Sequence, residues 1–239
     1  MIVAENEHRP AYKSTTFIYL DKEKQLLQNE KSVKLLGIWI DDKLTFEKHV
    51  DTLLKKGNQK FLALMRVSNY MDQDKLRILL KTFIESQFNY SPLVWMFHSK
   101  HINNRINKLH ERALRAVYKN YSCSFEELLE IDRSFTIHDR NLQKLALLMY
   151  QVKHNLCSKP IQEIFKINEN GNWRIPKVRT EHNGKETLRY RGPTTWNLLP
   201  SNLKSIESLE TFKKEIVKWK PVGCSCKLCK LYIKDLGYI

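Results

Sequence analysis

The sequence predicts a mainly α-helical protein with a small N-terminal β element, an α+β arrangement dominated by helices. From residue 45 onward, apolar residues recur at the three- and four-residue spacing of a helix. Apolar β-branched and aromatic runs of strand length lie mainly within the first 44 residues. Hydrophobic residues make up 42% of the 239 residues, with Gly 7 and Pro 7, which excludes a disordered, collagenous or low-complexity chain.

Two apolar runs predict the β element. Residues 15–20 are β-branched and aromatic, residues 21–30 form a polar connection, and residues 33–40 form a second apolar run that ends at Asp41 and Asp42. A two-stranded sheet alone is marginally stable in water. We therefore expect residues 1–46 to form the edge of a domain.

Three helices are predicted over residues 47–120, which we expect to form one bundle. The first starts near residue 45, with Gly57 as a weak point. The second spans residues 73–89, with Asp72 as its N-cap and Pro92 beyond its end. The third spans residues 102–119. The apolar positions expected in the core of the second and third helices are Leu76, Leu79, Leu80, Phe83, Ile84, Ile102, Ile106, Leu109, Ala113 and Val117.

Further helices are predicted over residues 121–167. Ser124 and Glu127 have the spacing of a capping box, and Thr136 begins a strongly apolar helix that runs to about residue 154. The helical pattern breaks over residues 168–185, so we predict a hinge there and a basic C-terminal subdomain over residues 168–239. Within that subdomain we expect a short strand at residues 187–190, a turn at residues 191–193 and a last helix over residues 209–220.

The charge balance points to a polyanionic partner. Lys and Arg number 41 against 26 Asp and Glu, a net charge of +15, and residues 171–239 hold over half of that excess. Nucleic acid is a common partner of such a chain. No apolar run reaches the length of a membrane span and no apolar signal core is present, so we expect a nuclear or cytoplasmic protein that is neither secreted nor in a membrane.

The third predicted helix carries the best candidate for phosphate contacts. At 100° per residue, five of its basic residues fall within about 80° of arc, and Glu111 is the only acid among the helix positions. Such a stripe can meet successive backbone phosphates. The alternative is a solvated helix face. The five residues are Arg105, Lys108, Arg112, Arg115 and Lys119.

A second basic group lies in the C-terminal subdomain, where cations alternate with aromatic residues. Stacking aromatics among cations suit single-stranded nucleic acid. The competing interpretation places Trp196 in the core and the arginines on the surface. The group comprises Arg174, Lys177, Arg179, Arg189 and Arg191, with Trp173, Tyr190 and Trp196.

Cys224, Cys226 and Cys229 form a C-x-C-x₂-C motif whose thiolates are suitable ligands for zinc. A closed zinc site needs a fourth ligand, and His182, Cys157 or a residue of a second chain could supply it. The alternative is a set of reduced surface thiols.

Several short motifs follow one another in a specific order. Residues 35–46 (LLGIWIDDKLTF) precede Lys48-His49-Val50, and residues 91–95 (SPLVW) precede residues 109–115 (LHERALR). Residues 136–138 (TIH) with 140–143 (RNLQ), residues 191–193 (RGP) with 196–197 (WN), and the Cys-rich tail complete the series. From residue 33 onward, this series resembles the C-terminal third of reverse transcriptases from jockey-like non-LTR (LINE) retrotransposons.

The resemblance implies that residues 33–46 correspond to the last palm strands, residues 47–119 to the thumb, and the rest to the post-thumb region. It also implies that the catalytic aspartates of an RNA-directed DNA polymerase belong to a segment upstream of the matched one. We therefore expect binding of RNA, DNA or their hybrid without copying. Mg²⁺ would serve only the intact parent polymerase, and zinc is the one cofactor suggested for this chain.

Two other classes of function stay open. Asp21, Asp41 and Asp42 could form a minimal metal-dependent nuclease or polymerase site, since two-metal catalysis needs carboxylates from different strands. Turn chemistry instead assigns Asp41 and Asp42 to the turn before a helix. The other class is a host-adopted protein-interaction module.

Overall fold

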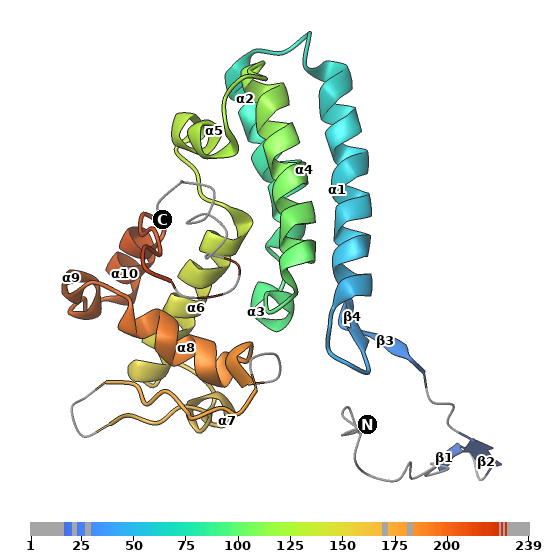
Figure 1. Cartoon of the computed structure of the whole chain (residues 1–239). Helices are drawn as coiled ribbons and strands as arrows, with labels where there is room; N and C mark the ends of the chain where they lie inside the picture. The colour runs from blue at the N-terminus through green and yellow to red at the C-terminus, as the bar shows by residue number, and fades with distance from the viewer. Residues whose placement is uncertain are drawn as a thin grey trace.

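The helices of the computed structural model form two lobes joined by one long helix (Figure 1). The structure describes residues 17–20, 23–26, 30–168, 172–180, 184–224, 226 and 228. The predicted class, mainly α with a small N-terminal β element, is confirmed. Over these residues, no helix combines the length and apolar character needed to cross a membrane.

The β element consists of two separate antiparallel hairpins. Strand β1 (Phe17–Leu20) pairs with β2 (Glu23–Leu26), and β3 (Ser32–Leu35) pairs with β4 (Ile38–Asp41). Two predictions were wrong here, because the polar connection contains β2 and the run over residues 33–40 is a hairpin, not one strand. Leu36 and Gly37, with φ of 46° and 86°, supply the two positive φ values that a tight hairpin turn requires.

Helix α1 (Glu47–Val67) is continuous through Gly57. A β-carbon on Gly57 would lie 2.6 Å from Cδ2 of Leu109, so the glycine leaves room for the Leu109 side chain to pack against the helix. The prediction of a weak point was therefore wrong, because packing, not local flexibility, accounts for this residue.

The second predicted helix has three parts. Helix α2 (Gln73–Leu79) starts at Asp72, whose carboxylate accepts from Lys75 N at 2.9 Å, as predicted. A π-helical turn η1 (Leu80–Ile84) and a 3₁₀ turn η2 (Glu85–Phe88) follow. The π turn shifts the helical register. Phe83, expected in the core, is consequently 51% exposed, whereas Glu85 is buried.

Of the remaining helices of the first lobe, α5 (Phe125–Asp132) follows its predicted cap, and α4 (Lys100–Tyr118) begins two residues before its predicted start. After α3 (Pro92–Trp95), α4 begins at the cap Ser99, and α5 carries the capping box of Ser124 and Glu127. All five apolar positions predicted on α4 are buried. Helices α1, α2, α4 and α5, with η1 and η2, enclose the first hydrophobic core.

Helix α6 (Ile137–Lys153), capped by Thr136, leads into the second lobe. There it packs with α7 (Lys159–Gln162), α8 (Leu188–Asn197), α9 (Ser201–Lys204) and α10 (Leu209–Ile216). The predictions of a strand at residues 187–190 and of a turn at residues 191–193 were wrong. Helix α8 contains residues 188–190 and the whole of residues 191–193. Helix α10 ends four residues before the predicted boundary.

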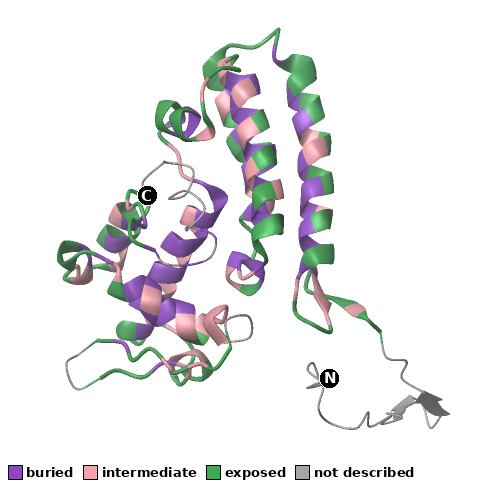
Figure 2. Cartoon of the chain, in the orientation of Figure 1, coloured by how far each residue is buried: buried purple, intermediate pink, exposed green. Residues whose placement is uncertain are grey.

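One core crosses the predicted boundary between residues 167 and 168. It joins Met149 and Tyr150 of α6 to Phe165 and Trp173, and it also includes residues of α8 and α10. Figure 2 shows buried positions along α6 and α8 where the two helices meet. The described part of residues 168–185 thus packs into the same unit as α6, and does not separate two subdomains as the predicted hinge required.

Candidate nucleic-acid interface

The predicted stripe on α4 lies along the seam between α4 and α1. Arg105 Nη1 lies 2.6 Å from Asp51 Oδ1 of α1. Arg112 lies over the ring of Phe61 of α1, 4.6 Å from its centroid, and Nη1 donates to Asn58 Oδ1 at 3.5 Å. These contacts fix the direction in which two arginines of the stripe leave the helix.

The other three members of the stripe lie further along α4. Arg115 is paired with Glu111 at 2.6 Å and donates from Nη1 to the carbonyl oxygen of Tyr121 at 2.7 Å. Lys108 is exposed, and Lys119 is the exposed C-cap of α4 with φ of 51°. The structure therefore brings all five residues to one side of the helix, with two of them already in ion pairs.

Helix α1 adds a cation that the sequence analysis missed. Exposed Lys55 lies one turn after Asp51 and just before Asn58, so helical spacing places it on the edge of α1 that faces α4. The signal was available in the α1 periodicity, but only the α1–α4 pairing identifies this edge. We call Lys55, Arg105, Lys108, Arg112, Arg115 and Lys119 the α1–α4 basic face.

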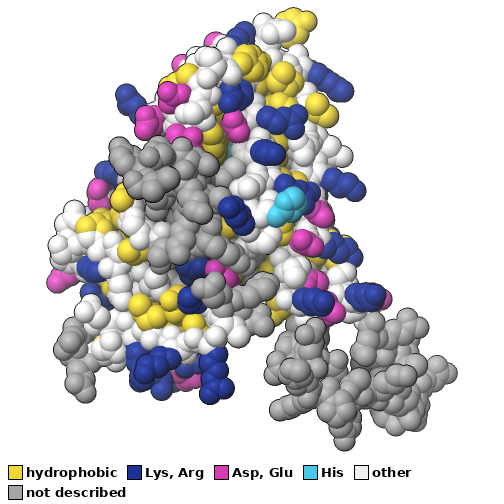
Figure 3. Space-filling model, viewed as in Figure 1, with side chains coloured by type: hydrophobic (Ala, Val, Ile, Leu, Met, Phe, Trp, Pro, Cys, Tyr) yellow, Lys and Arg dark blue, Asp and Glu magenta, His cyan; other side chains and the backbone are white. Residues whose placement is uncertain are grey.

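The α1–α4 basic face belongs to the first lobe of the molecule. Figure 3 shows Lys and Arg side chains spread over α1 and α4, with acidic side chains also among them in the lower part of the view. Two of the six basic residues are paired with acids, Arg105 with Asp51 and Arg115 with Glu111. The charge of the face thus stays strongly positive after pairing.

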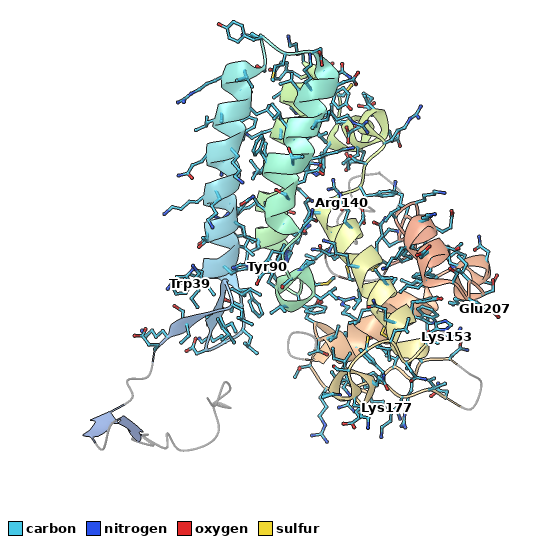
Figure 4. All side chains as sticks on the ribbon, turned by 180° about the vertical axis from the view of Figure 1, so that it is seen from behind. Trp39, Tyr90, Arg140, Lys153, Lys177 and Glu207 are labelled. Carbon is cyan, nitrogen blue, oxygen red and sulfur yellow. The ribbon has the colours of Figure 1, made fainter. Side chains whose placement is uncertain are left out.

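The second predicted group is only partly a surface. Arg174, Arg179 and Arg189 are exposed, as is Lys177, which extends from the α7 end of the molecule in Figure 4. Trp173 and Trp196 are buried in the second core, so neither offers a ring face for stacking. The interpretation that placed Trp196 in the core is confirmed.

Arg191 was wrongly assigned as a phosphate contact. It is 7% exposed and its Nη2 lies 2.6 Å from Glu186 Oε1. Burial alone would lower the pKa of Arg191, but the hydrogen bond to Glu186, the charge of Glu186 and the nearby Cys226 and Cys224 together outweigh burial and raise the pKa. The residue is committed to an internal ion pair.

An open hollow of about 680 Å³ lies beside the exposed arginines. It combines two cations, three amides and an aromatic edge, a lining that can accept a polar anionic group. Its lining residues are Asn168, Asn172, Trp173, Arg174, Ile175, Asn197 and Lys204.

The hydrogen bonds of Asp41 disfavour the alternative metal site of Asp21, Asp41 and Asp42. Asp41 accepts hydrogen bonds from the backbone amides of Lys43, Thr45 and Phe46 at 3.2, 2.9 and 2.7 Å. Both carboxylate oxygens are therefore used to shape the loop before α1, which confirms the turn assignment for Asp41. Asp21 lies outside the described residues.

Two of the three cysteines in the Cys-rich tail are not surface thiols. Cys224 and Cys226 are buried, and Cys226 Sγ lies 3.3 Å from Nε2 of His138 at the start of α6. Cys157 packs with the second core, while Cys229 and His182 lie outside the described residues. Within the described residues, no group of three or more His, Cys, Asp or Glu side chains is placed to hold a metal ion.

A search of protein-family models, of curated proteins and of solved structures found no match to this chain.

Proposed function

We propose that this chain binds RNA, DNA or an RNA–DNA hybrid through the α1–α4 basic face, as the thumb and post-thumb part of a LINE-type reverse transcriptase. The observation that carries the proposal is the alignment of six cations along one helix pair, with two acids among them. The resemblance described above supplies the parent activity, RNA-directed DNA synthesis.

The length of the face supports a duplex or extended strand as the ligand. From Arg105 to Lys119 the stripe extends about 21 Å along the axis of α4, at 1.5 Å per residue. One strand of a duplex advances about 3.4 Å per phosphate, so the stripe matches about six phosphates. Contacts of this kind position a strand without reading its sequence.

The contacts inside the face divide its residues into two kinds. Asp51, Glu111 and Phe61 orient the three arginines and offset part of their charge. Lys55, Lys108 and Lys119 are exposed and form no ion pair with an acid among the described residues. The lysines should therefore contribute the most salt-sensitive phosphate contacts.

The direct test replaces those three lysines. We expect Lys55→Gln, Lys108→Gln and Lys119→Gln together to weaken binding to an RNA–DNA hybrid and to lower the slope of log affinity against log salt by about three. Fluorescence anisotropy over a salt series measures both quantities. Circular dichroism should show unchanged helicity, because all three side chains are exposed.

The matched control removes three exposed lysines from the second lobe, Lys213, Lys214 and Lys220. It lowers the net charge by the same amount, so it should change the affinity and the slope much less. Equal effects of the two triple variants would contradict the assignment of the α1–α4 basic face.

One observation favours the protein-interaction module as a second candidate. The β3–β4 hairpin exposes three apolar side chains, with Leu36 at its tip 82% exposed and Val33 and Leu35 at 41% and 47%. Apolar contacts do not weaken with salt as phosphate contacts do. A chain that binds no nucleic acid at low salt would favour this candidate over the first.

A further inference from the structure

The open hollow of the second lobe lies between a loop and the ends of two helices. On one side is the segment around Trp173, which is held by an isolated β-bridge between Ile167 and Trp173. On the other side are Asn197 at the end of α8 and Lys204 at the end of α9. Asn197 Nδ2 donates to the carbonyl oxygen of Trp173 at 3.5 Å. The hollow is therefore built by tertiary contacts between its two sides.

Two cations line the hollow, and a third lies close to one of them. Arg174 is exposed, and half-buried Lys204 donates from Nζ to the carbonyl oxygen of Asn197 at 3.0 Å. Lys153 Nζ donates to the carbonyl oxygen of Lys204 at 3.3 Å. Burial and the charge of Lys153 both lower the pKa of Lys204. Because none of the described lining residues is acidic, a bound anion would offset this repulsion between cations.

Three asparagines supply the rest of the polar lining. The side-chain amides of Asn168, Asn172 and Asn197 each combine donors and an acceptor in one planar group. Such an amide can form two hydrogen bonds with the edge of a base such as adenine. Ile175, which also lines the hollow and is 40% exposed, offers apolar surface to a ring. The lining thus provides cations for a phosphate and amides for a base.

The size of the hollow agrees with a ligand of this kind. Its volume of about 680 Å³ lies within the range of about 300–1,000 Å³ that is typical of small-molecule sites. We propose that this hollow binds a single nucleotide, with Arg174 and Lys204 holding the phosphate and the three asparagines contacting the base. The nucleotide is either free or the terminal unit of a strand. The site is separate from the α1–α4 basic face, so either proposal can fail without the other.

Isothermal titration calorimetry of the full chain with adenosine 5′-monophosphate tests the site. We expect saturable binding of one nucleotide per chain. Adenosine should bind about tenfold more weakly or worse, because it lacks the phosphate and its charge-assisted hydrogen bonds. Equal affinities for nucleotide and nucleoside, or no binding at millimolar nucleotide, would overturn the proposal. Inorganic phosphate that binds as tightly as the nucleotide would overturn the contact with the base.

Variants locate the binding site. Arg174→Gln and Lys204→Gln should each weaken nucleotide binding about tenfold. The matched controls Lys213→Gln and Lys214→Gln remove the same charge from exposed positions on α10 and should change the affinity little. Arg174 is exposed, so its variant keeps the test decisive if Lys204→Gln, which loses the bond to Asn197, fails to fold. Equal effects of the two pairs would contradict the location.

The asparagine contacts have their own comparison. Asn172→Ala should weaken nucleotide binding, whereas Asn69→Ala, an exposed residue of the first lobe, should leave it unchanged. Wild-type affinity in Asn172→Ala would contradict the contact of this residue with the base.

Two further measurements separate this site from the basic face and identify the source of the nucleotide. The triple lysine variant of the α1–α4 basic face should bind adenosine 5′-monophosphate like the wild type, and a parallel loss would contradict a separate site. A trinucleotide that begins with 5′-phosphorylated adenosine is then compared with the free nucleotide. Similar affinities would assign the site to strand ends, and much weaker binding of the trinucleotide would assign it to free nucleotides.

Discussion

The carboxylate of Glu85 is buried and is bonded by residues of two other helices. It is 4% exposed, accepts from Arg140 Nη2 at 2.8 Å, and lies 3.1 Å from Nε2 of His110. Burial alone would raise the pKa of Glu85, but the hydrogen bonds from His110 and Arg140 and their electrostatic attraction together outweigh burial and hold the pKa well below its usual range. One ionised carboxylate thus links η2, α4 and α6.

Removing that charge should leave Arg140 without its buried partner. We expect Glu85→Gln to lower the free energy of unfolding by about 3 kcal/mol, because a buried pair that loses one member leaves an uncompensated charge. Urea denaturation at pH 7 measures the change. The exposed control Glu126→Gln should stay within about 0.5 kcal/mol, and an equally small effect of Glu85→Gln would contradict the role assigned to this carboxylate.

The same residue predicts a dependence of stability on acid. Because the pKa of Glu85 is lowered by folding, its stabilising contribution is complete above the ordinary value of 4.5 and is lost as the pH falls below it. Between pH 6 and pH 3 the wild type should lose about 2 kcal/mol more than Glu85→Gln, at 1.4 kcal/mol per pH unit. Parallel pH profiles of the two proteins would refute this.

Asp41 and Asp42 provide a matched pair for the turn assignment. Asp41→Ala removes the acceptor of three backbone amides and should cost about 1–2 kcal/mol of stability. Asp42→Ala should cost less than about 0.5 kcal/mol, since Asp42 is exposed. Thermal unfolding compares them. A metal-dependent nuclease or polymerase activity lost in Asp42→Ala would instead support the catalytic alternative.

At the scale of elements, caps were predictable and helix interruptions were not. Asp72, Ser124 and Thr136 each accept the backbone hydrogen bond that their sequence position predicts, because a cap depends on residues within one turn. The helix through Gly192-Pro193 packs closely against distant residues, and the π turn η1 interrupts the predicted second helix. The local sequence holds no signal for either.

Gly192 shows how such a contact decides an element. A β-carbon there would lie 2.7 Å from Sδ of Met149 and 2.9 Å from Cε1 of Phe165. Gly192→Ala should gain about 1 kcal/mol of helix propensity but lose more to overpacking, a net destabilisation of about 1–2 kcal/mol. Chemical denaturation should show this, with exposed Arg189→Ala as a near-neutral control in the same helix. A stabilised Gly192→Ala would mean that α8 packs less closely.

At the scale of the whole molecule, two cores meet along α6. Arg140 lies between α6 and the first lobe in Figure 4, where its bonds to Glu85 tie the two lobes together. The predicted boundary at residue 167 placed the division in the wrong position, since periodicity records that a helix ends but not which core its neighbours share. Contacts between distant residues, such as Arg105 with Asp51, are likewise invisible to periodicity.

The candidate interface was predictable in part for the same reason. A stripe within one helix follows from the spacing of its residues, so the five α4 cations were found from sequence. Lys55 could be assigned to the interface only from the packing of α1 beside α4. Arg191 had to be removed from the candidate contacts, because its burial and its ion pair with Glu186 depend on tertiary structure. The tertiary structure thus changed which residues belong to the candidate interface, while the interface itself stayed on α4.

The salt dependence of binding tests the central claim most directly. The affinity of the wild-type chain for an RNA–DNA hybrid, measured between 50 and 200 mM salt, should fall about a thousand-fold if about six phosphates are contacted. A flat dependence over that range, or no binding at 50 mM, would contradict the account.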